Sequence, residues 1–298
     1  GYNLWWREFD YSSFNTAQYS TTSAAAQGVL GLPITENDSV SLLFGIDSNE
    51  ILTFGGSTPR SITNYIDAVG QRTFHAWRTE LGWARDTRND YFMPTGGTYQ
   101  RVSAEVTLPG STAQYYKLNY EFSKYWSLGP SFVLNTRAVL GYGDSYGSDM
   151  YRYICRVNGS DPQIPGQGTT TAPAADGTCG DGGTLDKTLV ATGLPFFENF
   201  YAGGTRSVRG FRDNTLGPRS EVISGYRGQP LGGSFKTTGS VELIFPKLFD
   251  SNAARVSAFF DFGNVFNGVD NFDAGELRAS TGVALLWRAP VGPISISY

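Results

Sequence analysis

The chain has 298 residues, of which 40% are hydrophobic, 14% aromatic and only 17% charged, and its net charge is −4. Soluble domains carry about 25% charged residues, so this protein is short of surface charge. A membrane-spanning helix needs an apolar run of about 18 residues, and the sequence contains none of that length, which excludes a helical membrane protein. Proteins that bind nucleic acids usually carry an excess of basic residues, and this chain has a net negative charge, so we expect no nucleic-acid partner. What remains is a β-rich chain, either a large sandwich or solenoid, or a barrel in an outer membrane.

Apolar and polar residues alternate most clearly in three segments, residues 97–108, 234–245 and 254–263. In the last of them, Val256 and Phe260 lie on one face and Asp261 on the other. Each segment is about 10 to 12 residues long, the length that a tilted strand needs to cross a bilayer. Strands of water-soluble sandwiches alternate in the same way but are mostly about 5–6 residues long. The lengths therefore favour a membrane barrel.

Extending this reading to the whole chain predicts eleven strands and no helix of any length. The strands are expected near residues 2–11, 20–31, 39–46, 73–85, 97–108, 115–126, 130–143, 233–245, 254–264, 277–288 and 292–298.

The predicted connections differ in length according to their order. The even-numbered ones are short, with turn residues such as Gly129-Pro130 and Gly292-Pro293. The odd-numbered ones are mostly longer, and the fourth of these runs over residues 144–232. Short turns on one rim and long loops on the other are typical of outer-membrane barrels, whose short turns face the periplasm. Because bacterial single-chain barrels have even strand numbers and cannot leave strand edges unpaired in lipid, eleven strands predict that the chain is incomplete.

Aromatic residues gather near the predicted strand ends. Aromatic pairs occur at residues 5–6, 115–116 and 125–126, and Trp287 lies near the end of the strand predicted at 277–288. Amphipathic rings favour the membrane–water boundary, so these residues fit two girdles around a barrel. The alternative is that they form the core of a sandwich.

Few residues could support chemistry. His75, the lone histidine, has no partner by motif and is interpreted as a structural or surface residue, so we expect no enzyme, no metal site and no cofactor. The acidic stretch at 269–276 lacks the spacing of a calcium loop and is interpreted as a polar hairpin loop. Cys155 and Cys179 lie in a Gly/Pro/Thr-rich stretch and are predicted to form a disulfide in an oxidising compartment; two free thiols are the alternative.

The long connection at 144–232 exceeds the usual length so far that it must be functional or disordered. Its second part, LPFFENFYAGGTRSVRGFRDNTLGPRS (residues 194–220), is dense in Phe, Gly and Arg and is expected to fold back onto the protein. The run YAGG, followed by the motif of Val208, Arg209, Gly210 and Phe211, resembles the lid-loop signature of the BamA family of outer-membrane β-barrel assembly factors. The segments 89–118, SVELIFP, FFDFGNVF and GVALLWRAPVGPISISY extend this resemblance over essentially the whole chain.

The resemblance implies an all-β, transmembrane antiparallel barrel of sixteen strands, of which about eleven are present, with residues 144–232 as a long external lid loop that plugs the lumen. Residues 1–298 would then be one partial barrel domain that begins at the fifth strand of the family and stops within the fifteenth. The periplasmic POTRA domains, and the first and last strands that form the lateral gate, would lie outside it.

The function implied is to fold and insert β-barrel proteins into the Gram-negative outer membrane without ATP, by templating client strands at a lateral seam. The partners implied are unfolded barrel clients, periplasmic-side lipoproteins that bind mainly through POTRA domains, and a membrane of lipid and lipopolysaccharide. Three alternatives remain: a TamA-type or two-partner-secretion transporter, a passive porin-like channel, and a soluble extracellular β-protein.

The resemblance also implies a contact inside the barrel. In the family the motif arginine reaches acidic side chains on the inner wall, which correspond here to Arg209 with Glu242 and Asp261. The alternation described above places both acids on the polar, lumen-facing side of their strands. A guanidinium between two carboxylates forms strong, bidentate hydrogen bonds. We further expect Gly210 to permit a tight backbone turn and Phe211 to pack beside it.

Overall fold

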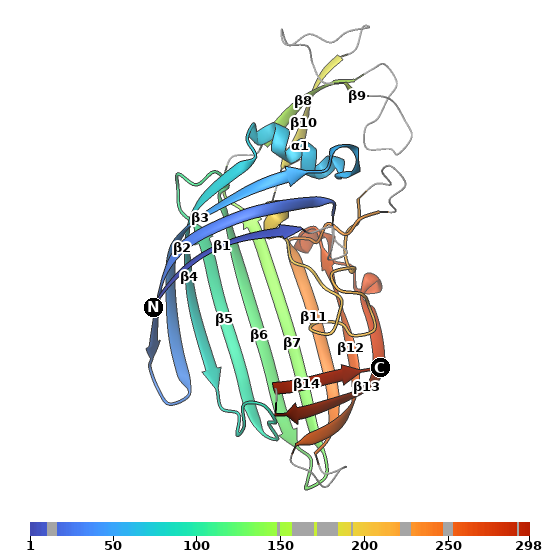
Figure 1. Cartoon of the computed structure of the whole chain (residues 1–298). Coiled ribbons are helices and arrows are strands. Elements are labelled where there is room, and N and C mark those ends of the chain that lie inside the picture. The colour runs from blue at the N-terminus through green and yellow to red at the C-terminus, as the bar shows by residue number, and fades with distance from the viewer. Residues whose placement is uncertain are drawn as a thin grey trace.

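The computed structural model describes residues 1–10, 17–147, 150–156, 170–171, 184–191, 193–220, 228–246, 253–290 and 292–298. Eleven strands form one antiparallel sheet in the order β1-β2-β3-β4-β5-β6-β7-β11-β12-β13-β14. Figure 1 shows this sheet as a curved wall. The strands are β1 (Tyr2–Asp10), β2 (Tyr19–Pro33), β3 (Asp38–Thr53), β4 (Thr73–Asp86), β5 (Gly97–Thr107), β6 (Tyr115–Ser127), β7 (Val133–Ser145), β11 (Phe235–Phe245), β12 (Ala254–Phe266), β13 (Arg278–Ala289) and β14 (Gly292–Ser297).

All eleven predicted strands are therefore confirmed, and neighbours in the chain pair with one another throughout the sheet. The main difference lies in β3, which continues seven residues beyond the predicted end at Ile46 to Thr53. The polar–apolar alternation breaks down in this extension, because Glu50 is exposed on the outer face whereas the apolar Ile51 is buried on the inner face. The long connections lie at one end of the wall, here called the outer end, and the short ones at the inner end.

The two faces of the wall differ in polarity. On the convex face, apolar side chains such as Leu118, Val241 and Phe260 are 41 to 48% exposed. On the concave face, polar side chains such as Glu105 and Asp261 are buried, with 8% and 1% exposed. In soluble proteins the apolar side chains are buried and the polar ones exposed. The opposite arrangement seen here is typical of a barrel whose outer face contacts lipid and whose lumen is polar. In the part of the chain that the structure describes, no helix has the length and apolar character needed to cross a membrane.

The predicted aromatic girdles are only partly present. Trp6, Trp126 and Trp287 lie on the exposed face, with 44 to 68% of each residue accessible. Tyr115, by contrast, is 1% exposed and faces the lumen. Because side chains alternate along a strand, only one member of each adjacent aromatic pair can face lipid. The prediction that both members belong to a girdle was therefore wrong.

The outer end carries a helix that the sequence did not predict. Helix α1 (Arg60–Val69) follows β3 and ends at Gly70, whose left-handed backbone (φ 75°) closes the last turn. Ile62, Tyr65 and Ile66 are buried on one side of α1, against Tyr19 and other apolar residues of the outer end. The sequence did not predict this helix, because a helix of only ten residues has a short apolar pattern and is stabilised mainly by tertiary packing.

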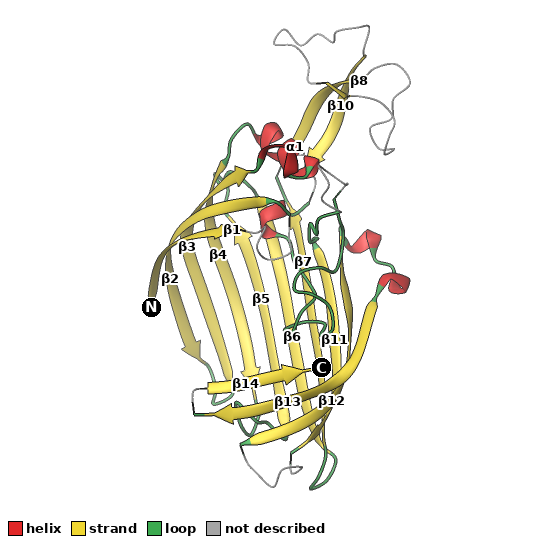
Figure 2. Ribbon diagram, turned by 45° about the vertical axis from the view of Figure 1, so that its right-hand side comes forward, coloured by secondary structure: helices red, strands yellow, loops and turns green. Residues whose placement is uncertain are grey.

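A second sheet lies in the long connection, beside α1 at the outer end. It comprises β8 (Met150–Arg156), β9 (Thr170–Thr171) and β10 (Thr184–Ala191), in the order β10-β8-β9. Figures 1 and 2 show β8 and β10 projecting away from the wall. The next part of the connection, residues 194–220, is called the lid segment below. In both views it turns back inside the curve of the sheet, near β11 and β12.

Candidate functional site

The lumen side of β11, β12 and β13 presents two rows of side chains that run across the three strands. Strand pairing sets Ser240, Asp261 and Ser280 side by side in the first row. Glu242, Phe259 and Gly282 form the second row, one step along each strand. An added Cβ at Gly282 would lie 2.7 Å from the Phe259 ring, so the glycine makes room for that ring. The result is an acidic patch beside a flat aromatic surface.

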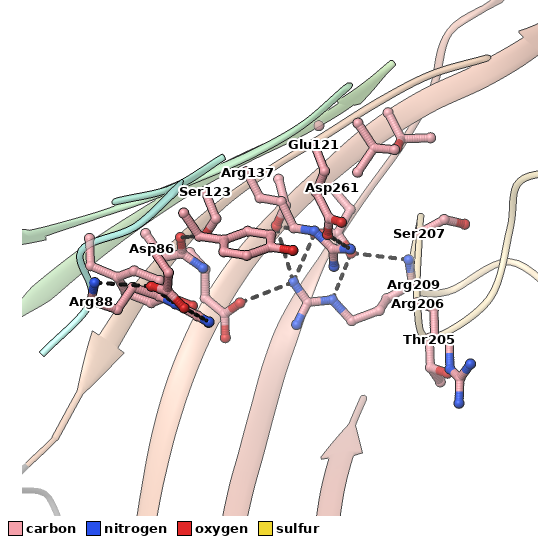
Figure 3. Close-up of a pocket in the computed structure, with 18 of the residues that line it drawn as sticks. Asp86, Arg88, Glu121, Ser123, Arg137, Thr205, Arg206, Ser207, Arg209 and Asp261 are labelled. Atoms are coloured by element: carbon pink, nitrogen blue, oxygen red, sulfur yellow. Dashed lines mark hydrogen bonds and ion pairs between the residues drawn. The ribbon is translucent and has the colours of Figure 1, made fainter. Parts of the chain in front are cut away.

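Arg209 of the lid segment lies on this patch (Figure 3). Its Nε and Nη2 atoms donate to the two carboxylate oxygens of Asp261, at 2.6 and 2.8 Å. Nη2 also lies 3.4 Å from Oε2 of Glu242 and 3.2 Å from Oγ of Ser240. The guanidinium carbon is 3.6 Å from the centroid of the Phe259 ring, a cation–π contact. The structure thus brings together the three residues that the resemblance linked.

The backbone of Arg209 is held as well as its side chain. Its N–H donates to Asp261 at 3.0 Å, and its carbonyl accepts a hydrogen bond from the Ser280 hydroxyl. Gly210 follows with φ 84°, the left-handed conformation that the sequence led us to expect. Phe211 packs with Val208 in a small apolar cluster on Val265 of β12. Arg209, Asp261, Glu242, Ser240 and Ser280 together are called the Arg209 lock.

The electrostatics of the Arg209 lock favour the charged form of its arginine. The side chains of Arg209 and Asp261 are 14% and 1% exposed, so their attraction is weakly screened. Burial alone would lower the pKa of Arg209, but its bonds to Asp261 and the charge of Glu242 outweigh that cost and raise the pKa above its ordinary value. The arginine accordingly stays charged, and its loss would leave two acids facing each other in the lumen.

The lock borders a polar cavity of about 490 Å³ in the lumen. Arg88 and Asp86 lie at another part of its wall and form an ion pair, and Arg137 of β7 pairs with Glu121 of the neighbouring β6. Both acidic and basic side chains line the cavity. Such a lining suits the holding of a loop in water better than the recognition of one small ligand.

A second group of charges contacts the lid segment from a different part of the wall. Glu198 accepts hydrogen bonds from Arg78 of β4 at 2.9 Å and from Lys117 of β6 at 3.0 Å. Arg78 also pairs with Asp47 of β3 at 2.7 Å and with Glu105 of β5 at 3.5 Å. Glu198, Arg78, Lys117, Asp47, Glu105 and the adjoining Tyr115 are called the Glu198 cluster.

Sequence reasoning missed the Glu198 cluster. Its members come from β3, β4, β5, β6 and the lid segment, so no local spacing joins them. The one available signal was the placement of an acid, Glu198, in an aromatic run that was expected to fold back into the protein.

Three further predictions concern His75, the cysteine pair and the acidic loop. His75 lies on the exposed face of β4, in agreement with its interpretation as a surface residue. The predicted pairing of Cys155 with Cys179 lies outside the residues whose side chains the structure describes. Residues 269–276 form a loop with two short 3-10 turns, and among the described residues no group of three or more His, Cys, Asp or Glu side chains is arranged to hold a metal ion.

Comparisons with known proteins agree with this architecture. The family model of the Omp85 superfamily domain matches residues 1–298. The chain is 29% identical to the outer membrane protein assembly factor BamA of Neisseria meningitidis serogroup B, over 100% of this chain and 36% of that protein. It is 32% identical to BamA of Nitratidesulfovibrio vulgaris, over 35% of this chain and 13% of that protein.

A solved structure shows the same fold. The crystal structure of BamA from Haemophilus ducreyi lacking POTRA domains 1–3 superposes with a TM-score of 0.75 and 26% identity, covering 100% of this chain and 54% of that one. The chain thus spans about a third of the meningococcal protein and about half of the crystallised chain. The family match, the antiparallel membrane wall and the lumen lock agree: the chain belongs to the Omp85 superfamily, and it is a BamA-like β-barrel integral to the Gram-negative outer membrane.

Proposed function

We propose that the protein of which this chain is part folds and inserts β-barrel proteins into the outer membrane. The observation that carries the proposal is the similarity to BamA, an outer membrane protein assembly factor, over the whole chain. The Arg209 lock supports it, because a loop held inside the lumen suits an assembly factor better than it suits an open channel.

The proposed mechanism needs no chemical catalysis and no ATP. An unfolded client would add its strands to an exposed strand edge, where main-chain hydrogen bonds replace those lost from water. Such an edge must be opened in lipid, where unpaired backbone groups cost several kcal/mol each. The free energy released as the client's strands pair and bury apolar surface in lipid would drive the process.

The proposed partners follow from the same similarity. They are unfolded β-barrel clients, lipoprotein subunits on the periplasmic side that bind mainly through POTRA domains, and a membrane of lipid and lipopolysaccharide. The Arg209 lock would hold the lid segment in place while the wall rearranges.

The proposal can be tested with the full-length protein reconstituted in liposomes without nucleotide. A urea-unfolded eight-stranded outer-membrane barrel serves as the client, and its folding is followed by the shift in migration of unboiled samples on gels. We expect client folding to be faster than in empty liposomes and to be slowed by Arg209→Ala or Glu242→Ala.

Client folding at the rate of empty liposomes would overturn the assembly function. Wild-type rates for both variants would leave assembly intact and remove the Arg209 lock from its mechanism. A large, steady conductance that Arg209→Ala does not change would favour a passive channel instead.

A further inference from the structure

The lid segment touches the barrel wall at two separate places. The Arg209 lock lies on β11, β12 and β13, whereas the Glu198 cluster lies on β3, β4, β5 and β6, on the other side of β7 in the sheet. Only ten residues of chain separate Glu198 from Arg209. This stretch is therefore attached at both ends to different parts of one curved wall.

Two cations of the wall, Arg78 and Lys117, bind the Glu198 carboxylate. The two positive side chains, Arg78 and Lys117, are 19% and 16% exposed, and that of Glu198 is 12% exposed. The contacts that the structure describes for the Lys117 ammonium are with Glu198 and with the ring of Phe200, both in the lid segment. Without the lid segment, this half-buried ammonium would lose its hydrogen bond and its ring contact, and Glu105, opposite it on β5, would be left as its acidic neighbour.

The charge on Glu198 is favoured at neutral pH. Burial alone would raise its pKa, but the positive charges of Lys117 and Arg78 outweigh burial, so the pKa of Glu198 lies below its ordinary value. The remaining members of the Glu198 cluster that face this carboxylate are Glu105, Asp47 and Tyr115. Glu198 thus binds its site as a carboxylate.

Aromatic packing supports the same attachment. Phe197 lies 4.9 Å from Phe74 of β4, measured between ring centroids, and Phe196 lies 5.4 Å from Tyr65 of α1. Phe200 lies against β7 at Gly141, where an added Cβ would come within 2.8 Å of the ring. The wall and helix α1 therefore form a recess for residues 196–200.

A third contact holds the far end of the connection to the same side. The Gln229 side chain accepts a hydrogen bond from the backbone N–H of Gln18 at 2.6 Å and donates to the carbonyl of Ser57 at 2.9 Å. Gln18 directly precedes β2, and Ser57 follows β3. The entry of the lid segment, and Gln229 beyond its end, are thus tied to the β2–β6 side. The tip around Arg209 lies on β11–β13, and Ala202, Leu216 and Gly217 also lie against Val265 of β12.

We propose that Glu198 is a positioning residue that anchors the entry of the lid segment independently of Arg209, so that the segment braces two parts of the barrel wall. Release of the Arg209 lock would then free the tip of the segment while its entry stays in place. The inference goes beyond the proposed function, since it concerns the loop and holds whether or not the protein assembles clients.

Amide hydrogen exchange of the full-length protein in lipid nanodiscs tests this. The structure supplies two sets of reporter amides. At the entry, Glu198 N–H donates to Pro195 and Phe200 N–H to Gly233; at the tip, Arg209 N–H donates to Asp261. Glu198→Gln keeps the shape of the side chain and removes its charge. Because charge-assisted hydrogen bonds are about twice as strong as neutral ones, we expect exchange at residues 196–200 to rise about tenfold or more.

The variants should separate the two attachments. Arg209→Ala should speed exchange at the tip and leave the entry protected, and the double variant should expose both. Lys117→Gln should reproduce the effect of Glu198→Gln at the entry, which keeps the test valid if one of the two variants fails to fold. Glu36→Gln, in an exposed turn at the inner end, is the matched control and should change neither.

Two results would overturn the proposal. One is unchanged protection of residues 196–200 in both Glu198→Gln and Lys117→Gln. The other is full loss of that protection in Arg209→Ala alone, which would mean that a single lock holds the whole segment.

Discussion

Arg209 shows how much of the site depends on the shape of one side chain. Its planar guanidinium spans both oxygens of Asp261 and still reaches Glu242. A lysine could supply the charge but only as a point, without the two parallel bonds. The role of this residue is thus geometric as well as electrostatic.

We expect Arg209→Ala to destabilise the folded barrel by about 3–5 kcal/mol, because it leaves the buried Asp261 carboxylate without its cation. Arg209→Lys should lose less. The measurement is the temperature at which unboiled protein changes its migration on a gel. Arg206→Ala, an exposed arginine of the same segment, is the control. Equal behaviour of all three variants would contradict this account.

The residue-level result also shows what the sequence could and could not predict. Alternation placed Glu242 and Asp261 on the lumen side, and the family resemblance paired them with Arg209, so these three members of the Arg209 lock could be predicted. Ser240 and Ser280 were not predicted as members. Glu198 could not, because Arg78 and Lys117 lie on different strands and become neighbours only when the sheet curves. A charged contact between distant segments leaves no periodic trace.

At the scale of elements, α1 is a cap on the outer end whose stability comes from contacts rather than from its own sequence. Its buried side meets the aromatic rings of β2, of β4 and of the lid segment. A ten-residue helix is marginal when isolated in water. The helix is therefore stabilised by its contacts with the wall and the lid segment, with which it forms the recess for residues 196–200.

We expect Ile62→Ala, at a position that is 1% exposed, to cost about 2–5 kcal/mol locally. The loss should appear as faster proteolysis within residues 55–70, with the strands of the wall unaffected. Ser61→Ala, on the exposed side of the same helix, should leave cleavage unchanged. Unfolding of the whole barrel at the same protease concentration would contradict a local role.

The strands, by comparison, were predictable because lipid and lumen impose opposite polarities on alternate residues. The alternation of polar and apolar residues did not predict the strands at the outer end, which lies beyond both the lipid and the lumen. The extension of β3 beyond Ile46 and the pair β8 and β10 lie at the outer end, where packing against α1 and other local contacts replaces the contrast between lipid and water.

At the scale of the whole molecule, the convex face is an apolar surface fitted to a bilayer. Val241 lies at the middle of β11 and is 41% exposed on this face. An arginine near the midplane of a lipid-facing strand costs about 2–4 kcal/mol.

Val241→Arg should therefore lower the yield of folded protein when the unfolded chain is added to lipid vesicles, as measured by gel migration. Val241→Leu keeps the apolar surface and should fold like the wild type. Equal yields for the two variants would place this face outside the lipid.

The row of Ser240, Asp261 and Ser280 has a consequence for the accuracy of folding. The three side chains line up only when β11, β12 and β13 pair in their native register. A slip of β12 by one residue would turn Asp261 toward lipid and offer Phe260 or Phe262 to the lumen. Arg209 would then lose Asp261, the carboxylate that both Nε and Nη2 contact, and would keep only the longer contact with Glu242. The bidentate contact between Arg209 and Asp261 therefore requires a wall in which β11, β12 and β13 are aligned in this register.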